Sequence, residues 1–146
     1  MQIQVLALIA VLTVMSGCLD HATGPRFTQI EGPEPGKAVV YLYLPDHFAT
    51  ALGIYVNDAL ITRLPSQSYY RYVTDPGVMT FSAGEGPQRQ VTAHLEAGTT
   101  LFIRLGIIRW NTLLGSAFDT NLIPVADWTA LRELPGLQLV LPSDTE

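Results

Sequence analysis

The stretch KAVVYLYL, from Lys37 to Leu44, decides the fold class of this chain of 146 residues. Alternate side chains point to opposite faces of a strand. Here both alternating sets are apolar or aromatic: Val39, Tyr41 and Tyr43 in one, and Ala38, Val40 and Leu42 in the other. A strand with two apolar faces is buried on both sides. We therefore expect Lys37–Leu44 to be a central strand of a sheet.

Further short runs of strand-forming residues follow this stretch, separated by turn residues about every eight to twelve positions, as in sandwiches and barrels. They are Leu52–Val56, Ala59–Leu64, Gln67–Val73, Val78–Ser82, Arg89–Leu95 and Thr99–Leu105, with Leu137–Leu141 as a candidate last strand. No long helical pattern interrupts them. The sequence predicts a mainly β fold, an antiparallel β-sandwich of about seven or eight strands.

Local signals support individual elements of this sandwich. Asn57-Asp58 suits a tight hairpin turn, because both residues tolerate left-handed backbone. Thr74-Asp75-Pro76-Gly77 is a strong turn sequence. Arg89–Leu95 alternates apolar and polar residues, which predicts a strand with one face in water.

One short helix is expected near the end of the chain. Asp127–Leu134 carries Trp128, Leu131 and Leu134 at three-residue spacing and stops before Pro135-Gly136. An isolated helix of this length is marginal in water. We therefore expect this stripe, Trp128 included, to dock onto the sandwich.

The N-terminal sequence predicts where the protein is located rather than how it folds. Ile3–Val14 is almost entirely apolar but shorter than the roughly 20 residues of a membrane-spanning helix, and it ends at Met15-Ser16-Gly17-Cys18. This end resembles the bacterial lipobox, which implies cleavage before Cys18 and lipidation of that cysteine. The alternative is an ordinary cleaved signal peptide with a chance cysteine. An Asp directly after the cysteine would resemble the inner-membrane retention signal of enteric bacteria. Here Leu19 stands at that position and Asp20 comes one position later, so the resemblance favours the outer membrane if the host is Gram-negative.

These signals predict a simple domain organisation. Residues 1–17 form the signal peptide, residues 18–36 a flexible tether rich in glycine and proline, residues 37–142 the β-sandwich domain, and residues 143–146 a tail. The partner that this organisation implies is a membrane, reached through the lipid on Cys18.

Composition excludes one class of function. The chain has 8 Lys and Arg against 13 Asp and Glu, with a formal net charge of −5. No basic stripe is available for phosphates, so nucleic-acid binding is not expected. The single cysteine cannot form an intramolecular disulfide.

The residues that could carry catalysis or a metal are better explained in other ways. No G-x-S-x-G motif surrounds a serine, and Ser66, Ser68, Ser82 and Ser116 fit turn or strand positions. Asp46-His47 is at most half a metal site and fits a solvated loop better. Gly84–Pro87 lacks the lysine and helix of a phosphate loop. We predict no enzyme activity, no cofactor and no metal.

Two segments are candidate binding surfaces. The first is the cluster Tyr69, Tyr70, Arg71 and Tyr72, since tyrosine and arginine are frequent at interfaces; its alternative is a structural role in the core. The second lies in Leu105–Leu114, where Arg109 and Trp110 stand among apolar residues. A buried strand extension and an exposed apolar patch are both open there.

The middle of the chain resembles a known family. The segments that carry the resemblance are Lys37–Pro45, Tyr55–Asp58, Leu64–Tyr69, Asp75–Gly77 and Ala97–Arg104, and they resemble the DUF2846 family over roughly residues 37 to 141. That family consists of bacterial, often lipoprotein-like, β-rich domains of unknown function, so it implies no catalytic residues. The hairpin followed by Asp75-Pro76-Gly77 also resembles PEGA modules, which implies binding of carbohydrate or partner proteins.

Together these features predict a membrane-anchored lipoprotein of the bacterial cell envelope whose β-sandwich binds another envelope component without catalysing a reaction. A carbohydrate- or peptidoglycan-binding module is the main alternative, favoured by the tyrosines. A small hydrolase with a dispersed site is a weaker one.

Overall fold

The computed structural model describes residues 21–84 and 90–142. The predicted signal peptide, Cys18, the tail at 143–146 and residues 85–89 of the loop that begins at Gly84 lie outside the described residues.

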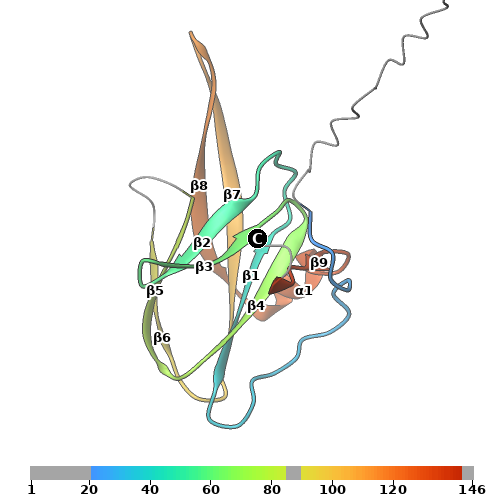
Figure 1. The fold of residues 1–146 in the computed structure, drawn as a ribbon, viewed down its shortest axis with the longest axis vertical. Coiled ribbons are helices and arrows are strands. Elements are labelled where there is room, and N and C mark those ends of the chain that lie inside the picture. Colours follow the sequence, from blue (N-terminus) through green and yellow to red (C-terminus); the bar gives the residue numbers. More distant parts are fainter. Residues whose placement is uncertain (1–20, 85–89, 143–146) are drawn as a thin grey trace, which may run out of the picture.

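The described chain folds into two β-sheets and one short helix (Figure 1). In chain order the elements are β1 (Ala38–Leu44), β2 (Leu52–Val56), β3 (Ala59–Leu64), β4 (Ser68–Thr74), β5 (Gly77–Ala83), β6 (Val91–Leu95), β7 (Thr100–Thr112), β8 (Gly115–Val125), α1 (Asp127–Glu133) and β9 (Gln138–Leu139). Sheet A has the order β8-β7-β1-β4-β9, and sheet B has the order β3-β2-β5-β6. The mainly β sandwich with one short helix that the sequence predicts is confirmed.

Strand β1 is the centre of the fold, as its two apolar faces predict. All of its residues are buried, and it lies between β7 and β4 in sheet A. One face of β1 packs in the core between the two sheets. The members of that core from both sheets include Val40, Leu42, Leu44, Ile54, Phe81, Leu95, Ile103 and Leu105.

The strand pairing is antiparallel except at two places, where β1 pairs with β7 and β4 pairs with β9 in parallel. The turn at Asp75 and Pro76 explains the first of these. It joins β4 of sheet A to β5 of sheet B, so the chain crosses between the sheets instead of forming a hairpin. When the chain returns as β7, it enters sheet A on the other side of β1 and runs in the same direction.

Two local predictions are confirmed. Asn57 and Asp58 both have positive φ, 48° and 68°, the conformation that a two-residue hairpin between β2 and β3 requires. In β6 the alternation is also as expected: Leu95 is buried, whereas Thr92 and His94 are exposed.

The prediction of a flexible tether is wrong for part of residues 21–36. Ala22 and Phe27 are buried, and the backbone N–H groups of Gly24 and Phe27 donate to the carbonyls of Leu139 and Leu137 at 3.0 and 2.8 Å. Glycine and proline exclude a helix here, but an extended segment can still pair with the open edge of a sheet. The packed domain therefore begins near Ala22 rather than at Lys37.

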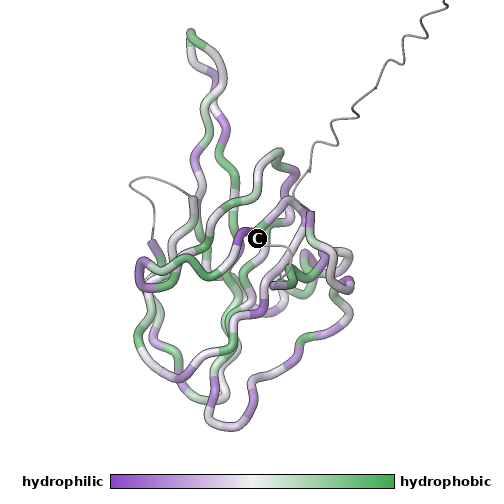
Figure 2. The backbone as a smooth tube through the Cα atoms, in the orientation of Figure 1, coloured by the Kyte–Doolittle hydropathy of each residue, from purple (hydrophilic) through white to green (hydrophobic). Residues whose placement is uncertain are grey.

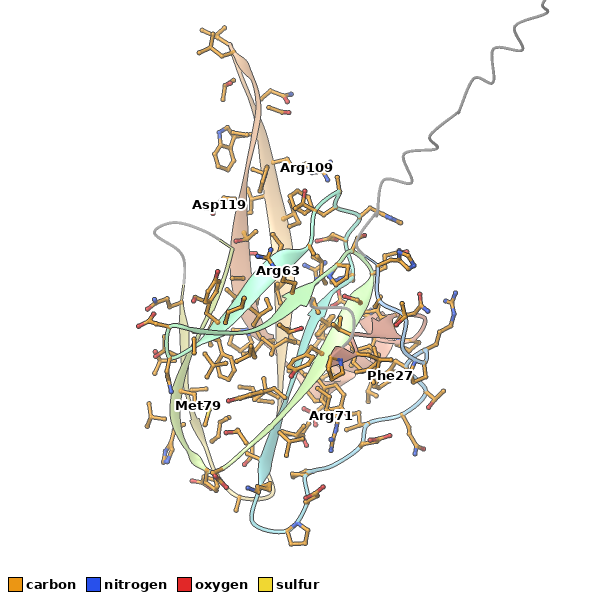
Figure 3. All side chains as sticks on the ribbon, in the orientation of Figure 1. Phe27, Arg63, Arg71, Met79, Arg109 and Asp119 are labelled. Atoms are coloured by element: carbon orange, nitrogen blue, oxygen red, sulfur yellow. The ribbon has the colours of Figure 1, made fainter. Side chains whose placement is uncertain are left out.

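This segment and α1 cover the outer face of sheet A. Phe27 packs edge-on to Tyr69 with ring centroids 5.6 Å apart, and Tyr41 stacks on Phe102 at 5.4 Å (Figure 3). Ala130 and Leu134 of the helical region complete the cluster. Sheet A is thus buried on both faces along β1.

The expected docking face of the helix is wrong for Trp128 and Leu131 and right for Leu134. Trp128 is 65% exposed and Leu131 is 46% exposed, while Ala130 and Leu134 are fully buried. The buried pair is four residues apart, so the inward face is rotated from the predicted stripe. The Trp128 ring instead lies on the surface beneath the Arg132 guanidinium, whose Cζ is 5.5 Å from the centroid of the ring.

Polar contacts also dock the helix. Arg104 Nε on β7 donates to both carboxylate oxygens of Glu133 at 3.2 Å, and the Tyr43 hydroxyl donates to Glu133 Oε2 at 2.7 Å. Burial first and the hydrogen bond to Glu133 second raise the pKa of Tyr43 above its ordinary value. Because Arg104 also reaches Asp46 at 3.3 Å, these contacts join the helix, both central strands and the loop after β1.

Candidate binding surface at the β7–β8 arm

The second half of β7 and the first half of β8 form a hairpin that stands out from the sandwich, which we call the arm (Figure 1). The sequence predicts a strand to Leu105 and leaves a buried strand extension over Leu105–Leu114 open. In the structure β7 continues to Thr112 and pairs with β8 from Phe102↔Val125 to Thr112↔Gly115. No strand is predicted from the sequence over residues 115–125, where the structure has β8. The alternation of Phe118, Thr120 and Leu122 is the signal that could have identified them.

The tip of the arm is apolar and bare. Leu113 and Leu114 are as exposed as in an extended chain, and Trp110 is 45% exposed (Figure 2 shows the apolar tip in green). Two interpretations are open for Leu105–Leu114, a buried strand extension and an exposed apolar patch, and each describes part of the segment. The segment is a strand, and its outer part is exposed.

The side chain of Thr112 binds two backbone groups of the turn at the tip. The Thr112 hydroxyl donates to the carbonyl of Gly115 at 2.7 Å and accepts from the N–H of Leu114 at 3.3 Å. These bonds extend the backbone ladder of β7 and β8 to the end of the arm.

The base of the arm is fixed to the loop that follows β1. Phe48 packs edge-on to Phe118 with centroids 4.7 Å apart, and Arg109 lies over the Phe48 ring at 5.9 Å. Arg109 Nη2 also donates to the carbonyl of His47 at 2.9 Å. Of the two predicted surface residues here, Arg109 therefore contacts the loop at the base of the arm, while Trp110 is partly exposed to solvent.

A cavity of about 340 Å³ lies beside the base, where the ends of β2 and β5 meet β8. Its lining residues are Phe48, Thr50, Ala51, Leu52, Gly53, Tyr55, Arg63, Gly84, Phe118, Asp119 and Thr120. The Thr120 hydroxyl donates to the Ala83 carbonyl at 3.2 Å and so ties β8 to sheet B behind the cavity.

Arg63 supplies the positive charge of the cavity (Figure 3). It is exposed and makes no hydrogen bond or ion pair with the part of the chain that the structure describes. It stands opposite Gly53, whose missing side chain leaves room for the Tyr55 ring, 3.2 Å from where a β-carbon would be. Asp119 is paired with Ile108, on the face of β8 away from Phe118, and its carboxylate accepts from the N–H of Thr120.

The first predicted surface, the tyrosine cluster, is mainly structural. Tyr69 is 7% exposed within the outer aromatic cluster, so its assignment to a binding surface is wrong. Tyr70 and Tyr72 pack against the core between the sheets. Burial raises the pKa of Tyr69 and Tyr70 above the ordinary value. Arg71 reaches the carbonyl of Gly32 at 2.9 Å and so helps to hold the N-terminal segment.

Four of the residues considered for catalysis and metal binding, Asp46, His47, Ser66 and Ser68, have structural partners. Ser66 donates to the Asp46 carbonyl and Ser68 to the Pro65 carbonyl. The His47 ring contacts the Gln67 amide at 3.1 Å, while the Asp46 carboxylate faces Arg104. Within residues 21–84 and 90–142, no group of three His, Cys, Asp or Glu side chains could hold a metal ion.

The seven-residue α1 is too short to cross a membrane, and no other helix of sufficient length and apolarity occurs among the described residues. Comparisons with protein-family models, curated proteins and solved structures found no match to this chain. The fold and the site therefore stand on the sequence and the geometry alone.

Proposed function

We propose that this protein is a lipid-anchored component of the bacterial cell envelope and that it binds another envelope protein at the arm base. The anchor is the lipid on Cys18, and the outer membrane is its destination if the host is Gram-negative. The resemblance to the DUF2846 family agrees with this proposal and adds no catalytic role.

One observation carries the binding role: the exposed Arg63 borders an aromatic-walled cavity next to a projecting arm. An arginine without a partner among the described residues favours a carboxylate on the ligand, because guanidinium and carboxylate groups form strong paired hydrogen bonds. Aromatic and arginine side chains in a pocket are also the usual anchors of protein interfaces. We therefore expect the partner to present an acidic side chain to the cavity.

No enzymatic role is proposed. A nucleophilic mechanism requires a serine or cysteine within reach of a histidine. Among the described residues, the hydroxyls of Ser66 and Ser68 bond to backbone carbonyls instead. No observation favours the small-hydrolase alternative.

A glycan-binding role is the second candidate, and Tyr55 favours it. The Tyr55 ring lies next to Gly53 and borders the same cavity, and an aromatic ring at a cavity can stack on a sugar. Peptidoglycan is the envelope polymer that such a site would meet.

Photo-crosslinking in cells tests the binding role. We expect a crosslinker in place of Thr50, an exposed residue that lines the cavity, to capture a protein partner identifiable by mass spectrometry, and Arg63→Gln to reduce that capture. The matched control replaces His94, which is exposed on sheet B but does not line the cavity, and should capture far less. Equal capture at both positions would contradict the site.

Sedimentation with isolated peptidoglycan separates the two candidates. If the purified protein cosediments and Tyr55→Ala abolishes this, the glycan role is correct and the protein-partner role is not. If the protein stays in solution while the crosslink from Thr50 persists, the protein-partner role is supported.

A further inference from the structure

The tip of the arm is an apolar surface that the proposed cavity does not use. Leu113 and Leu114 project fully into solvent, and Ile108 and Trp110 are partly exposed behind them. From Trp110 to Phe118 the arm carries no charged side chain. Two leucines at the end of a projecting hairpin form a concentrated apolar point rather than the scattered exposed residues that are normal on surfaces.

We infer that this tip inserts into the surface of the same lipid bilayer that holds Cys18, so that the protein has two membrane contacts. The inference rests on the proposed lipidation of Cys18. It adds a role for Leu113, Leu114 and Trp110, and it sets the orientation of the domain on the membrane.

The position of the chain start identifies the bilayer as the occupant. The described chain begins at His21, three residues after Cys18, and three residues span at most about 10 Å. In Figure 1 the blue start of the chain lies in the upper half of the body, the half from which the arm rises. A lipid on Cys18 therefore holds the membrane near the end of the body to which the arm belongs.

The length of the arm agrees with a shallow insertion. The contact of Arg109 with His47 and Phe48 is the last one between this strand and the body, and Leu113 comes four residues later. At about 3.3 Å per residue, the free part is about 13 Å long, similar to the reach of the chain from His21 to Cys18. With the leucines among the acyl chains, Trp110 would lie near the headgroups, where tryptophan is enriched in membrane proteins.

The polar groups of the tip permit this insertion. Unpaired backbone N–H and C=O groups are costly in hydrocarbon. The Thr112 hydroxyl pairs the N–H of Leu114 and the carbonyl of Gly115, and the strands behind the turn pair through the ladder from Arg109↔Phe118 to Thr112↔Gly115. The lack of charge on the arm beyond Arg109 also avoids the cost of placing an ionised side chain in the bilayer.

Charge favours an apolar contact over an electrostatic one. The chain has a net charge of −5 and a single lysine, so anionic lipids would not attract it. An uncharged tip approaches such a surface without repulsion, and the leucines supply the attraction.

Single-tryptophan fluorescence tests the inference, because the chain contains only Trp110 and Trp128. The acylated protein, which begins at Cys18 after cleavage, is reconstituted into vesicles of phosphatidylethanolamine and phosphatidylglycerol containing a brominated lipid. In the Trp128→Phe variant, we expect the Trp110 emission to shift to the blue and to lose intensity to the bromines. In the Trp110→Phe variant, Trp128 on α1 should show neither change.

A second variant assigns the effect to the tip. Leu113→Ser with Leu114→Ser, in the Trp128→Phe background, should lose most of the quenching while the protein still floats with the vesicles. If Trp110 is unquenched in the floating Trp128→Phe protein that keeps both leucines, the tip insertion is overturned and the lipid anchor is left intact. A protein that does not float would overturn the anchor, and the insertion with it.

Two further results would also overturn the inference. Equal quenching of both tryptophans would mean that the domain lies flat on the bilayer. A blue shift of Trp110 that grows with protein concentration without vesicles would mean that the tip binds a second copy.

Discussion

The two halves of β7 have similar residues and opposite surroundings. From Thr100 to Leu105 the strand is covered by sheet B on one face and by α1 with the outer cluster on the other, and Phe102, Ile103 and Leu105 are almost completely buried. From Ile107 to Thr112 it pairs only with β8, and Ile108 and Trp110 stand partly in water. An apolar strand thus becomes core or surface according to which elements reach it.

The covering elements end at the arm base. The loop at His47 and Phe48 reaches Arg109 and Phe118 and no farther. Exposed apolar surface beyond that point weakens solubility, and large patches of this kind usually mark contact sites. The comparison therefore separates residues that hold the fold from residues left free to make contacts.

The largest expected effect comes from removing an aromatic ring on the covered half of β7. Phe102→Ala takes away a side chain that is 1% exposed and stacked on Tyr41, so we expect the free energy of unfolding to fall by about 3–5 kcal/mol. Denaturant unfolding measures it.

The matched control lies on the bare half of the same strand. Trp110→Ala should change the free energy of unfolding by about 0.5 kcal/mol or less. If both variants lose similar stability, the arm packs against the body and the contrast between the halves of β7 is wrong.

The helix that covers the outer face of sheet A should show the same contrast. Leu134→Ala empties a fully buried position and should cost about 2–5 kcal/mol. Trp128→Ala removes only a surface ring under Arg132 and should cost less than about 1 kcal/mol. Thermal or denaturant unfolding of both variants tests the register of α1, and a larger loss for Trp128→Ala would contradict it.

The hydrogen bond between Tyr43 and Glu133 should contribute less than the buried side chains. Tyr43→Phe removes a donor to a carboxylate that Arg104 still holds, so we expect a loss of about 1.5 kcal/mol at neutral pH, at the low end for bonds to charged groups. Denaturant unfolding near neutral pH measures this loss, and an unchanged free energy would show that the bond adds nothing.

The same tyrosine predicts a pH dependence. Burial and Glu133 raise the pKa of Tyr43 in the folded state, so above about pH 10 the unfolded chain loses the phenolic proton first. The stabilisation is complete below that pH and declines as the pH rises, and Tyr69 and Tyr70 add in the same direction. Free energies of unfolding at increasing alkaline pH should fall less steeply for Tyr43→Phe than for the natural chain; parallel curves would exclude Tyr43 as a source.

The smallest effect on folding should come from the tip itself. Leu113→Ser with Leu114→Ser changes two fully exposed side chains and should leave the free energy of unfolding within about 0.5 kcal/mol of the starting value. The same variant is expected to lose the contact of the tip with the bilayer while the lipid anchor holds, so stability and tip contact would be separated. A large loss of stability would show that the tip belongs to the folded core.

Much of the candidate surface lay outside what sequence patterns can identify. The segment around Arg109 and Trp110 was recognised because its apolar residues stand in a run. Arg63, Phe48 and Phe118 were missed, since they come from three distant parts of the chain and meet only when β8 lies across the ends of sheet B. The assignment of Tyr69 to a binding surface is wrong because strand alternation shows that a strand has two faces, but it does not show that other elements cover both of them.

The sequence by itself determined the local elements of this protein: the central strand at Ala38–Leu44, the hairpin at Asn57 and Asp58, and the alternation of β6. Backbone preference and side-chain period act over a few residues, so these features can be read locally. Only the tertiary structure decided that Phe27 is buried, that Trp128 points outward and that the arm is bare. Burial depends on which distant segments come to lie against a surface, and that is a property of the assembled sheets rather than of any single stretch.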